Sequence, residues 1–299
     1  LIDNAGAQAE AFSLSSLDSL SPMQLSVTTS GGYNLDQRSV TISDTSISGT
    51  PGGSTVSGSY DLATGALNLS GEATSAQLSA FSDFGGSASG DWSVQRASTG
   101  APYRISFDGA GQNISATNTT LSQLLGDSPS VMATITWNDG SLTIENGAVA
   151  SETVSLTIDG RTSASGALTG EIDGQLLQPL DLPGARLESL QLDGTLSGTP
   201  GSPTANVQFS NGALGAGGMQ LTDLSGRTII STRDGLSINA DLTGAADGQP
   251  LDASFNLTRD SEALAISDVS ISAGALVLAA PSLTFEDGLP AGPFTLEGS

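Results

Sequence analysis

The sequence predicts an all-β protein: an elongated, mostly antiparallel, curved sheet that forms a trough with an apolar interior, with one or two short helices. The first observation behind this prediction is strict alternation of apolar and polar residues, as in 153–159, 237–242 and 251–257. A period of two places all apolar side chains on one face of a strand. The second is composition, because 38 glycines and only 4% aromatic residues fit a thin sheet better than a globule.

Strand candidates follow one another along most of the chain, at the spacing of about 8–12 residues that is typical of all-β architectures. The clearest candidates are 40–47, 55–62, 66–73, 91–95, 103–107, 131–137, 141–144, 153–159, 167–172, 187–196, 205–209, 220–224, 227–232, 236–242, 251–258, 263–271, 275–279, 282–285 and 294–296. Because alternation resumes after every turn, we expect residues 1–299 to form a single continuous, repetitive sheet segment.

Dipeptides that favour positive φ predict where the strands turn. Asp-Gly begins at 108, 139, 159, 173, 193, 234, 247 and 287, and Asn-Gly begins at 146 and 211. These pairs are typical of tight antiparallel hairpins, so we expect most of them at hairpin corners. Asp193-Gly194 is the exception, because it lies inside an alternating run and indicates a strand glycine or a bulge.

Two stretches depart from the strand period. A short helix is predicted near 119–126, because Thr119 or Thr120 can cap it and Gly126 can end it. A second short amphipathic helix is indicated by three leucines at a regular spacing: Leu14, Leu17 and Leu20.

Composition excludes most catalytic chemistry. The chain has no His and no Cys, and its eight basic residues are all Arg. This removes Ser-His-Asp and Cys-His nucleophiles, Schiff-base lysines and the commonest transition-metal ligands. We therefore expect no enzyme, no metal site and no cofactor. A carboxylate-pair glycosidase is the one common enzyme class left open, and the few aromatic residues supply little for sugar binding.

The charge of the chain limits its partners. A net charge of −23 argues against nucleic acid as a partner. The acidic residues are spread through turns and polar faces, where they favour solubility. The arginines are scattered and indicate a solvated face or rim; the alternative for Arg104 and Arg161, which lie next to strands, is contact with lipid phosphates at a groove mouth. No run of eighteen or more apolar residues occurs.

Several phrases in the second half of the chain follow a recognisable pattern. Residues 192–199 (LDGTLSGT) and 202–209 (SPTANVQF) together resemble the G-x-L-x-G-T-x-x-x-P-x-A-x-hydrophobic phrase of TamB-like proteins, the translocation and assembly module subunits of the AsmA-like group. Further phrases similar to recurring stretches of that family occur at 62–71, 121–126, 131–137, 142–147 and 168–174. The resemblance is strongest from about 119 to 299.

The resemblance implies a location and a role. Family members are periplasmic proteins of Gram-negative bacteria, anchored in the inner membrane, whose β-taco fold makes a trough with an apolar inside. They are implicated in moving phospholipid between the inner and outer membranes and, with an outer-membrane partner of the TamA type, in assembling outer-membrane proteins. This chain would be an internal periplasmic segment that binds phospholipid acyl chains, while the anchor and the partner-binding regions would lie outside it.

The residues lead to a similar expectation without the family. A sheet of about 20 strands at ~4.8 Å spacing extends on the order of 100 Å, and an apolar face of that size must be covered by another sheet, by its own opposite wall or by lipid. We predict a lipid groove lined by Ile105, Phe107, Ile135, Trp137, Val154, Leu156, Ile158, Val207, Phe209, Ile238, Leu242, Phe255, Leu257, Leu276, Leu278, Leu283 and Phe285. The alternatives are a structural or adhesive extracellular β-solenoid with a closed core and, with less support, a carbohydrate-active β-protein.

Overall fold

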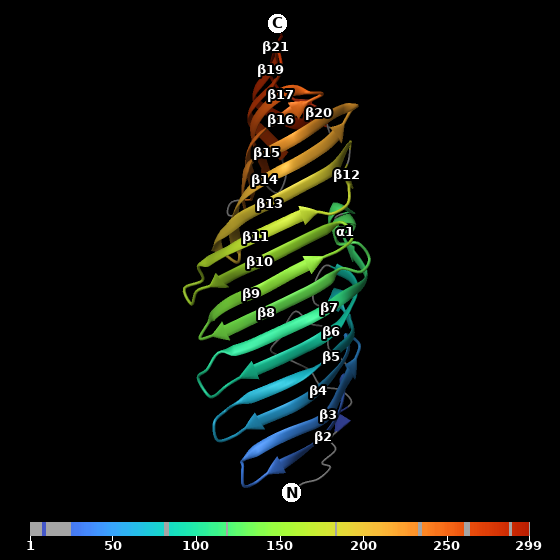
Figure 1. Ribbon diagram of the computed structural model, residues 1–299, viewed down its shortest axis with the longest axis vertical. Helices are drawn as coiled ribbons and strands as arrows, with labels where there is room; N and C mark the ends of the chain where they lie inside the picture. Colours follow the sequence, from blue (N-terminus) through green and yellow to red (C-terminus); the bar gives the residue numbers. More distant parts are fainter. Residues whose placement is uncertain are drawn as a thin grey trace. The chain divides into compact units, whose positions relative to one another are not determined.

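The computed structural model describes residues 8–9, 25–80, 84–117, 119–182, 184–232, 235–259, 264–286 and 289–298. The chain divides into two compact units, Leu1–Glu152 and Thr153–Ser299, which we call the N-terminal and C-terminal units. Both are built from antiparallel strands (Figure 1).

In the N-terminal unit each strand pairs with its neighbours in the chain, so the order in space follows the order in sequence. The strands are β1 (Gln8–Ala9), β2 (Leu25–Asn34), β3 (Ser39–Gly49), β4 (Gly52–Asp61), β5 (Leu67–Gln77), β6 (Phe84–Arg96), β7 (Tyr103–Ala116), β8 (Ser130–Asn138) and β9 (Ser141–Ala150). A 3-10 helix, η1 (Leu78–Ala80), follows β5, and the α-helix α1 (Thr119–Leu125) joins β7 to β8.

The C-terminal unit repeats this arrangement with two small departures. Its strands are β10 (Val154–Thr162), β11 (Leu168–Leu176), β12 (Leu180–Leu182), β13 (Ala185–Thr199), β14 (Ser202–Ala216), β15 (Met219–Ser231), β16 (Leu236–Ala246), β17 (Gln249–Arg259), β18 (Leu264–Ala273), β19 (Leu276–Glu286), β20 (Leu289–Ala291) and β21 (Thr295–Gly298). The short β12 pairs with the start of β13, so β11 also pairs with β13. Both β20 and β21 pair with β19.

The all-β class, the antiparallel pairing and the short helix near 119–126 are confirmed. Two pairs of predicted strands prove to be single strands, because 220–224 and all but the last residue of 227–232 lie in β15, and 282–285 and all but the first residue of 275–279 lie in β19. In β15 a bulge interrupts the alternation, which is why it reads as two strands in the sequence. The helix predicted around Leu14 to Leu20 lies outside the described residues.

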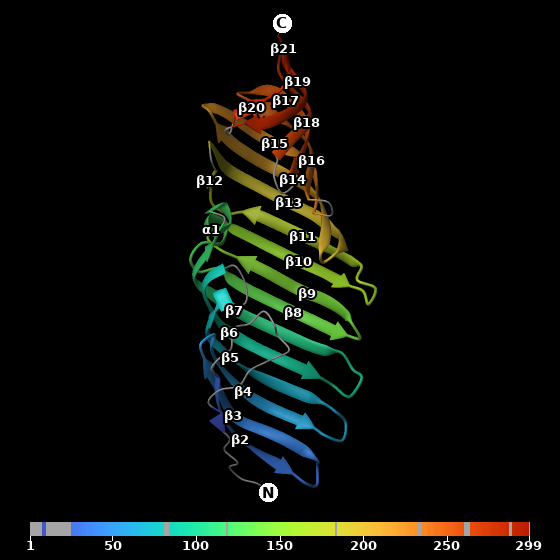
Figure 2. The ribbon, with the colours of Figure 1, turned by 180° about the vertical axis from the view of Figure 1, so that it is seen from behind.

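Bulges interrupt the pairing within many strands and bend the sheet. Ser75, Asn113, Asn211, Asp223 and Asp268 have positive φ angles of 51°, 53°, 52°, 54° and 53°. Each lies where the register with a neighbouring strand shifts. An extra residue of this kind bends its strand and increases the local twist. The sheet of each unit is accordingly bent across its strands, as the two opposite views show (Figures 1 and 2).

Large apolar side chains lie against glycines of the adjacent strand. Gly226 on β15 is the register partner of Phe209 on β14, and a Cβ added to Gly226 would lie 2.8 Å from Phe209 Cζ. Gly174 is likewise the partner of Leu192, whose Cγ lies 3.0 Å from such a Cβ. The large side chains therefore pack over the glycines of the adjacent strand and become partly buried within a single layer.

This packing overturns the interpretation of most Asp-Gly and Asn-Gly pairs as hairpin corners. The pairs that begin inside strands are those at Asp108, Asn146, Asp159, Asp173 and Asn211. Their polar residue lies on the polar face or in a bulge, and their glycine lies on the apolar face beside a neighbouring strand. These Asp-Gly and Asn-Gly pairs therefore result from the polar/apolar alternation of a strand, and not from a turn.

Some of these pairs do behave as predicted. Asp139-Gly140 has φ angles of 45° and 79°, and Asp247-Gly248 has 48° and 78°, so both form the positive-φ turns expected of tight hairpins. Asp193-Gly194 lies inside β13, which confirms the prediction of a strand glycine. Asp234 and the pair at 287–288 lie outside the described residues.

Replacing Gly226 by Ala should destabilise the protein. The new Cβ would lie 2.1 Å from the Asp241 carbonyl oxygen and 2.8 Å from Phe209 Cζ, so strands β14 to β16 would have to shift. We expect a loss of about 1–3 kcal/mol, measured as a lower urea midpoint. Gly32→Ala is the matched control, because nothing lies within 4 Å of a Cβ there. Equal midpoints for the two variants would contradict the packing described above.

Candidate ligand-binding face

One face of the N-terminal unit carries its apolar side chains, and we call it the N-terminal apolar face. Cross-strand register places on it a row with one residue from each strand from β2 to β9: Gly31, Ile42, Gly58, Leu69, Val94, Ile105, Ile135 and Ile144. A second row, which we call the aromatic row, lies two residues farther along each strand, next to the loops that join β2 to β3, β4 to β5, β6 to β7 and β8 to β9. It consists of Tyr33, Val40, Tyr60, Leu67, Arg96, Tyr103, Trp137 and Leu142. The face is thus continuous across eight strands.

The C-terminal unit has a corresponding C-terminal apolar face. One row on it consists of Leu156, Gly174, Leu192, Phe209, Gly226, Leu242, Ala253, Ile271, Leu278 and Leu296. A second row consists of Gly160, Gly170, Leu196, Ala205, Ile230, Ile238, Leu257, Ile266 and Leu283. Neither row contains a charged side chain.

The residues predicted to line a groove lie on these two faces. The N-terminal apolar face holds Ile105, Phe107, Ile135 and Trp137. The C-terminal apolar face holds Val154, Leu156, Ile158, Val207, Phe209, Ile238, Leu242, Phe255, Leu257, Leu276, Leu278 and Leu283. The side chain of Phe285 lies outside the described part of the structure. That these residues contact lipid stays a prediction.

Sequence reasoning missed other members of the same faces. Leu69, Val94, Ile172, Leu192 and Ile266 share rows with the predicted residues. The sequence did indicate their face, because each lies two positions from another apolar residue in its own alternating run. What the sequence lacked was the cross-strand register that joins these runs into rows.

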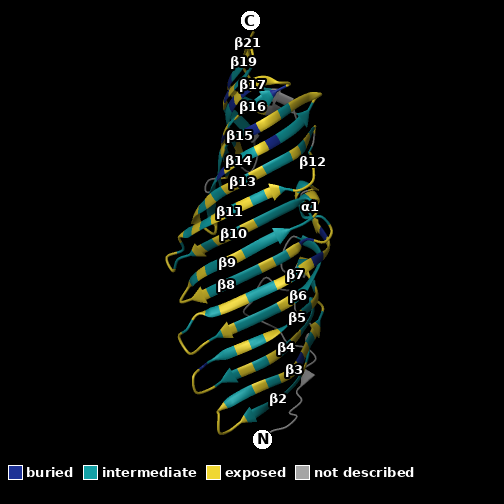
Figure 3. Cartoon of the chain, in the orientation of Figure 1, coloured by how far each residue is buried: buried dark blue, intermediate teal, exposed yellow. Residues whose placement is uncertain are grey.

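The apolar faces are enclosed only in part. A small cluster is buried in the C-terminal unit, where Leu224, Ala246 and Leu251 are 7–8% exposed and pack with Phe209 and Leu242. Elsewhere large apolar side chains remain open to solvent, namely Ile105 at 36%, Trp137 at 47% and Leu276 at 55%. Figure 3 shows exposed and half-buried residues alternating along the strands. In the described residues no second layer covers either face.

The opposite face of each unit is polar and acidic. None of the paired, described strand positions on either apolar face is Asp or Glu. On the polar face Glu72, Asp91 and Asp108 lie directly opposite one another on β5, β6 and β7, as do Asp173 and Asp193 on β11 and β13. Such like-charge pairs destabilise a sheet, and they are tolerated where water screens them.

Shallow hollows occur on the polar faces. One of about 600 Å³ is lined in part by Glu72, Asp91 and Asp108, and another of about 410 Å³ is lined in part by Asp173 and Asp193. Within the described residues, no group of three or more His, Cys, Asp or Glu is arranged to hold a metal ion. In both hollows, carboxylates on neighbouring strands face open space.

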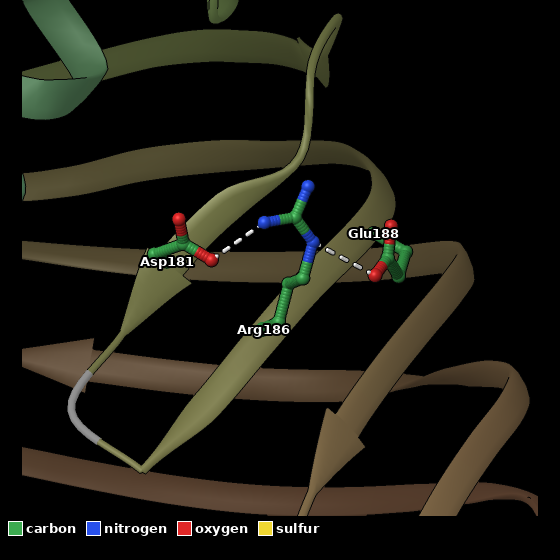
Figure 4. A network of polar contacts seen from close by, with 3 residues as sticks. All are labelled: Asp181, Arg186 and Glu188. Atoms are coloured by element: carbon green, nitrogen blue, oxygen red, sulfur yellow. Dashed lines mark hydrogen bonds and ion pairs between the residues drawn. The ribbon is translucent and has the colours of Figure 1, made fainter.

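Most arginine contacts belong to the polar face. At the β12–β13 hairpin the Arg186 guanidinium donates to Asp181 Oδ1 at 2.7 Å and to Glu188 Oε1 at 3.0 Å (Figure 4). These carboxylates raise the pKa of Arg186 above its ordinary value, with Asp181 contributing most. All three side chains are exposed, so the network orders the hairpin and adds little stability.

A second polar network lies on β7, β8 and β9. Thr136 Oγ1 donates to Glu145 Oε1 at 2.5 Å, and Arg104 Nη1 forms an ion pair with Glu145 Oε2. The Thr136 hydroxyl, followed by the positive charge of Arg104, holds the pKa of Glu145 below its ordinary value. The Arg104 side chain thus lies on the polar face, in an ion pair with Glu145.

No protein-family model matches the sequence, no curated protein matches it, and no solved structure matches the fold. In the part of the chain that the structure describes, no helix is both long enough and apolar enough to cross a bilayer. The resemblance to TamB-like proteins therefore stays a prediction, and the function has to be argued from the faces themselves.

The carboxyl of Glu145 should titrate at a lower pH than an unperturbed Glu. Because its folded-state pKa is depressed, its contribution to stability is present above the unfolded pKa of about 4.5 and is lost as the pH falls through the folded value. NMR titration should show the pKa of Glu145 rising in Thr136→Val, since the hydroxyl is the main cause of the shift. Thr143→Val, at the register partner of Thr136 on β9, should leave the pKa of Glu145 unchanged. The same pKa in both variants would contradict this assignment.

Proposed function

We propose that the chain binds lipid acyl chains along its two apolar faces and carries phospholipids through the periplasm between the inner and outer membranes. In this proposal it is a segment of a longer, inner-membrane-anchored protein of TamB-like type. It would also support outer-membrane protein assembly through a TamA-like partner that binds other regions. The resemblance of the sequence supports the location and the partner.

One observation carries the lipid-binding proposal: each apolar face is continuous across its strands, free of carboxylates at the paired described positions, and covered by no second layer of described residues. Exposed apolar surface costs about 25 cal/mol per Å², so such a face favours an apolar ligand. Acyl chains suit it, because they need no hydrogen-bonding partner.

The mechanism would be partitioning and sliding, without catalysis. The rows mix large apolar residues with Gly and Ala, as in Leu192, Phe209, Gly226, Leu242 and Ala253, so the surface stays apolar from strand to strand. A continuous apolar surface offers an acyl chain nearly the same free energy at each position. Movement along the C-terminal apolar face would then meet no deep trap, because neither of its two rows contains a charged side chain.

Photo-crosslinking tests this proposal. A photoreactive residue placed at Ile238 or Phe255 faces the C-terminal apolar face, whereas one at Asn239, next to Ile238 on β16, faces the polar side, where Asn239 donates to Asn256. Mass spectrometry should find phospholipid attached at Ile238 and Phe255 and none at Asn239.

Two other outcomes would count against it. Equal lipid attachment at Ile238 and Asn239 would mean nonspecific adsorption. Protein that is lipid-free in native mass spectrometry, with Ile238 and Phe255 protected from solvent, would favour a structural or adhesive role with a closed core.

A further inference from the structure

Arg96 is the one charged side chain on the described, paired positions of the N-terminal apolar face. It ends β6 within the aromatic row, opposite Leu67 of β5 and beside Tyr103 of β7. The next row along the strands is fully apolar there, with Val94, Ile105 and Ile135. A guanidinium thus lies at the hairpin end of an apolar surface, in a chain whose net charge is −23.

The guanidinium of Arg96 is held in place by neutral acceptors. Nε and Nη2 donate to the Gly65 carbonyl oxygen at 3.0 and 2.8 Å, and Nη1 donates to Tyr103 Oη at 2.5 Å. The guanidinium carbon lies 4.7 Å from the centroid of the Tyr103 ring. Because Arg carries five N–H groups, donor capacity remains on Nη1 and Nη2. The cation is therefore positioned but its charge is not neutralised.

No carboxylate of the described residues lies within ion-pair distance of Arg96, whereas Arg104 and Arg186 both have such partners. Arg96 is also half-buried, so water compensates its charge less well than at an exposed site. A planar guanidinium matches the oxygens of a phosphate group, and hydrogen bonds between charged groups are the stronger ones. An anion would therefore complete the contacts of this guanidinium.

The surroundings of Arg96 suit a polar head group next to acyl chains. Tyr103 stacks on Trp137 with ring centroids 5.6 Å apart, and Trp137 is 47% exposed. Tyr and Trp favour boundaries between apolar and wet surroundings. The hollow of about 620 Å³ beside Arg96 lies mostly on the polar face, where Asn68, Gln95 and Asp61 line it, so it is separate from the surface on which acyl chains would lie. The Asp61 carboxylate accepts from the amides of its own turn at 2.7 and 3.0 Å.

We propose that Arg96, supported by Tyr103, binds the phosphate of a lipid head group at the hairpin end of the N-terminal apolar face. The acyl chains of that lipid would lie on the row formed by Val94, Ile105 and Ile135. This inference rests on the proposed function, because it needs acyl chains on the same face. It adds a fixed position for the head group and a preference for lipids that carry a phosphate.

The test compares two lipids with identical acyl chains, phosphatidylglycerol and uncharged diacylglycerol, bound to the delipidated full chain and counted by native mass spectrometry. We expect Arg96→Gln to weaken binding of phosphatidylglycerol about tenfold and to leave diacylglycerol binding unchanged. Arg96→Lys should recover part of the loss, because it keeps the charge without the planar fork. Arg104→Gln is the matched control on the polar face and should change neither lipid.

Inorganic phosphate separates an anion site from a lipid site. It should compete with phosphatidylglycerol on the wild-type chain and should not displace diacylglycerol. Competition that persists unchanged in Arg96→Gln would overturn the assignment to Arg96.

The remaining outcomes separate this inference from the proposed function. Equal loss of both lipids in Arg96→Gln would make Arg96 a tether of the hairpin and overturn the head-group inference. Wild-type binding of both lipids with equal affinity, unchanged by Arg96→Gln, would overturn it too, while acyl-chain binding would stand. Binding of neither lipid by the wild-type chain would overturn both proposals.

Discussion

The contact between a large apolar side chain and a glycine on the adjacent strand is the interaction on which the rest of this structure depends. A sheet in a globular protein buries its apolar face against a second layer. Here the described residues provide no such layer, and Phe209 gains burial by lying over Gly226, as Leu192 does over Gly174. This explains why most apolar side chains are half-buried and so few are fully buried. The remaining exposure is what leaves the faces free for a ligand.

The polar face sets a complementary constraint. Carboxylates opposite one another, such as Asp91 and Asp108, repel each other, and they persist because water surrounds them. Confining acid to this side keeps the apolar faces free of negative charge. Arg96 stands out against that segregation, since it is the charged group that occupies the apolar side of the N-terminal unit.

Much of this arrangement could be predicted from the sequence, because a period of two depends only on residues in one strand. The parity of Ile238 and Asn239, and of Ile105 and Arg104, follows directly from alternation. Features that depend on a neighbouring strand could not be predicted. The glycine of Asp173-Gly174 looks like a turn signal until Leu192 is placed beside it, and the interruption at Asp223 looks like the end of a strand. Arg96 looks like a solvated rim residue because Tyr103 and Gly65 become its neighbours only through hairpin pairing.

The hairpin order of the strands has a consequence for how such a chain changes in length. Almost every strand contacts only the strands before and after it in the sequence. Each pair is therefore a module whose stability depends on its nearest neighbours, as in solenoid repeats. Duplicating or deleting one hairpin would lengthen or shorten the ladder by about 10 Å and leave distant contacts intact. The number of modules could thus change in evolution without loss of the contacts among those that remain.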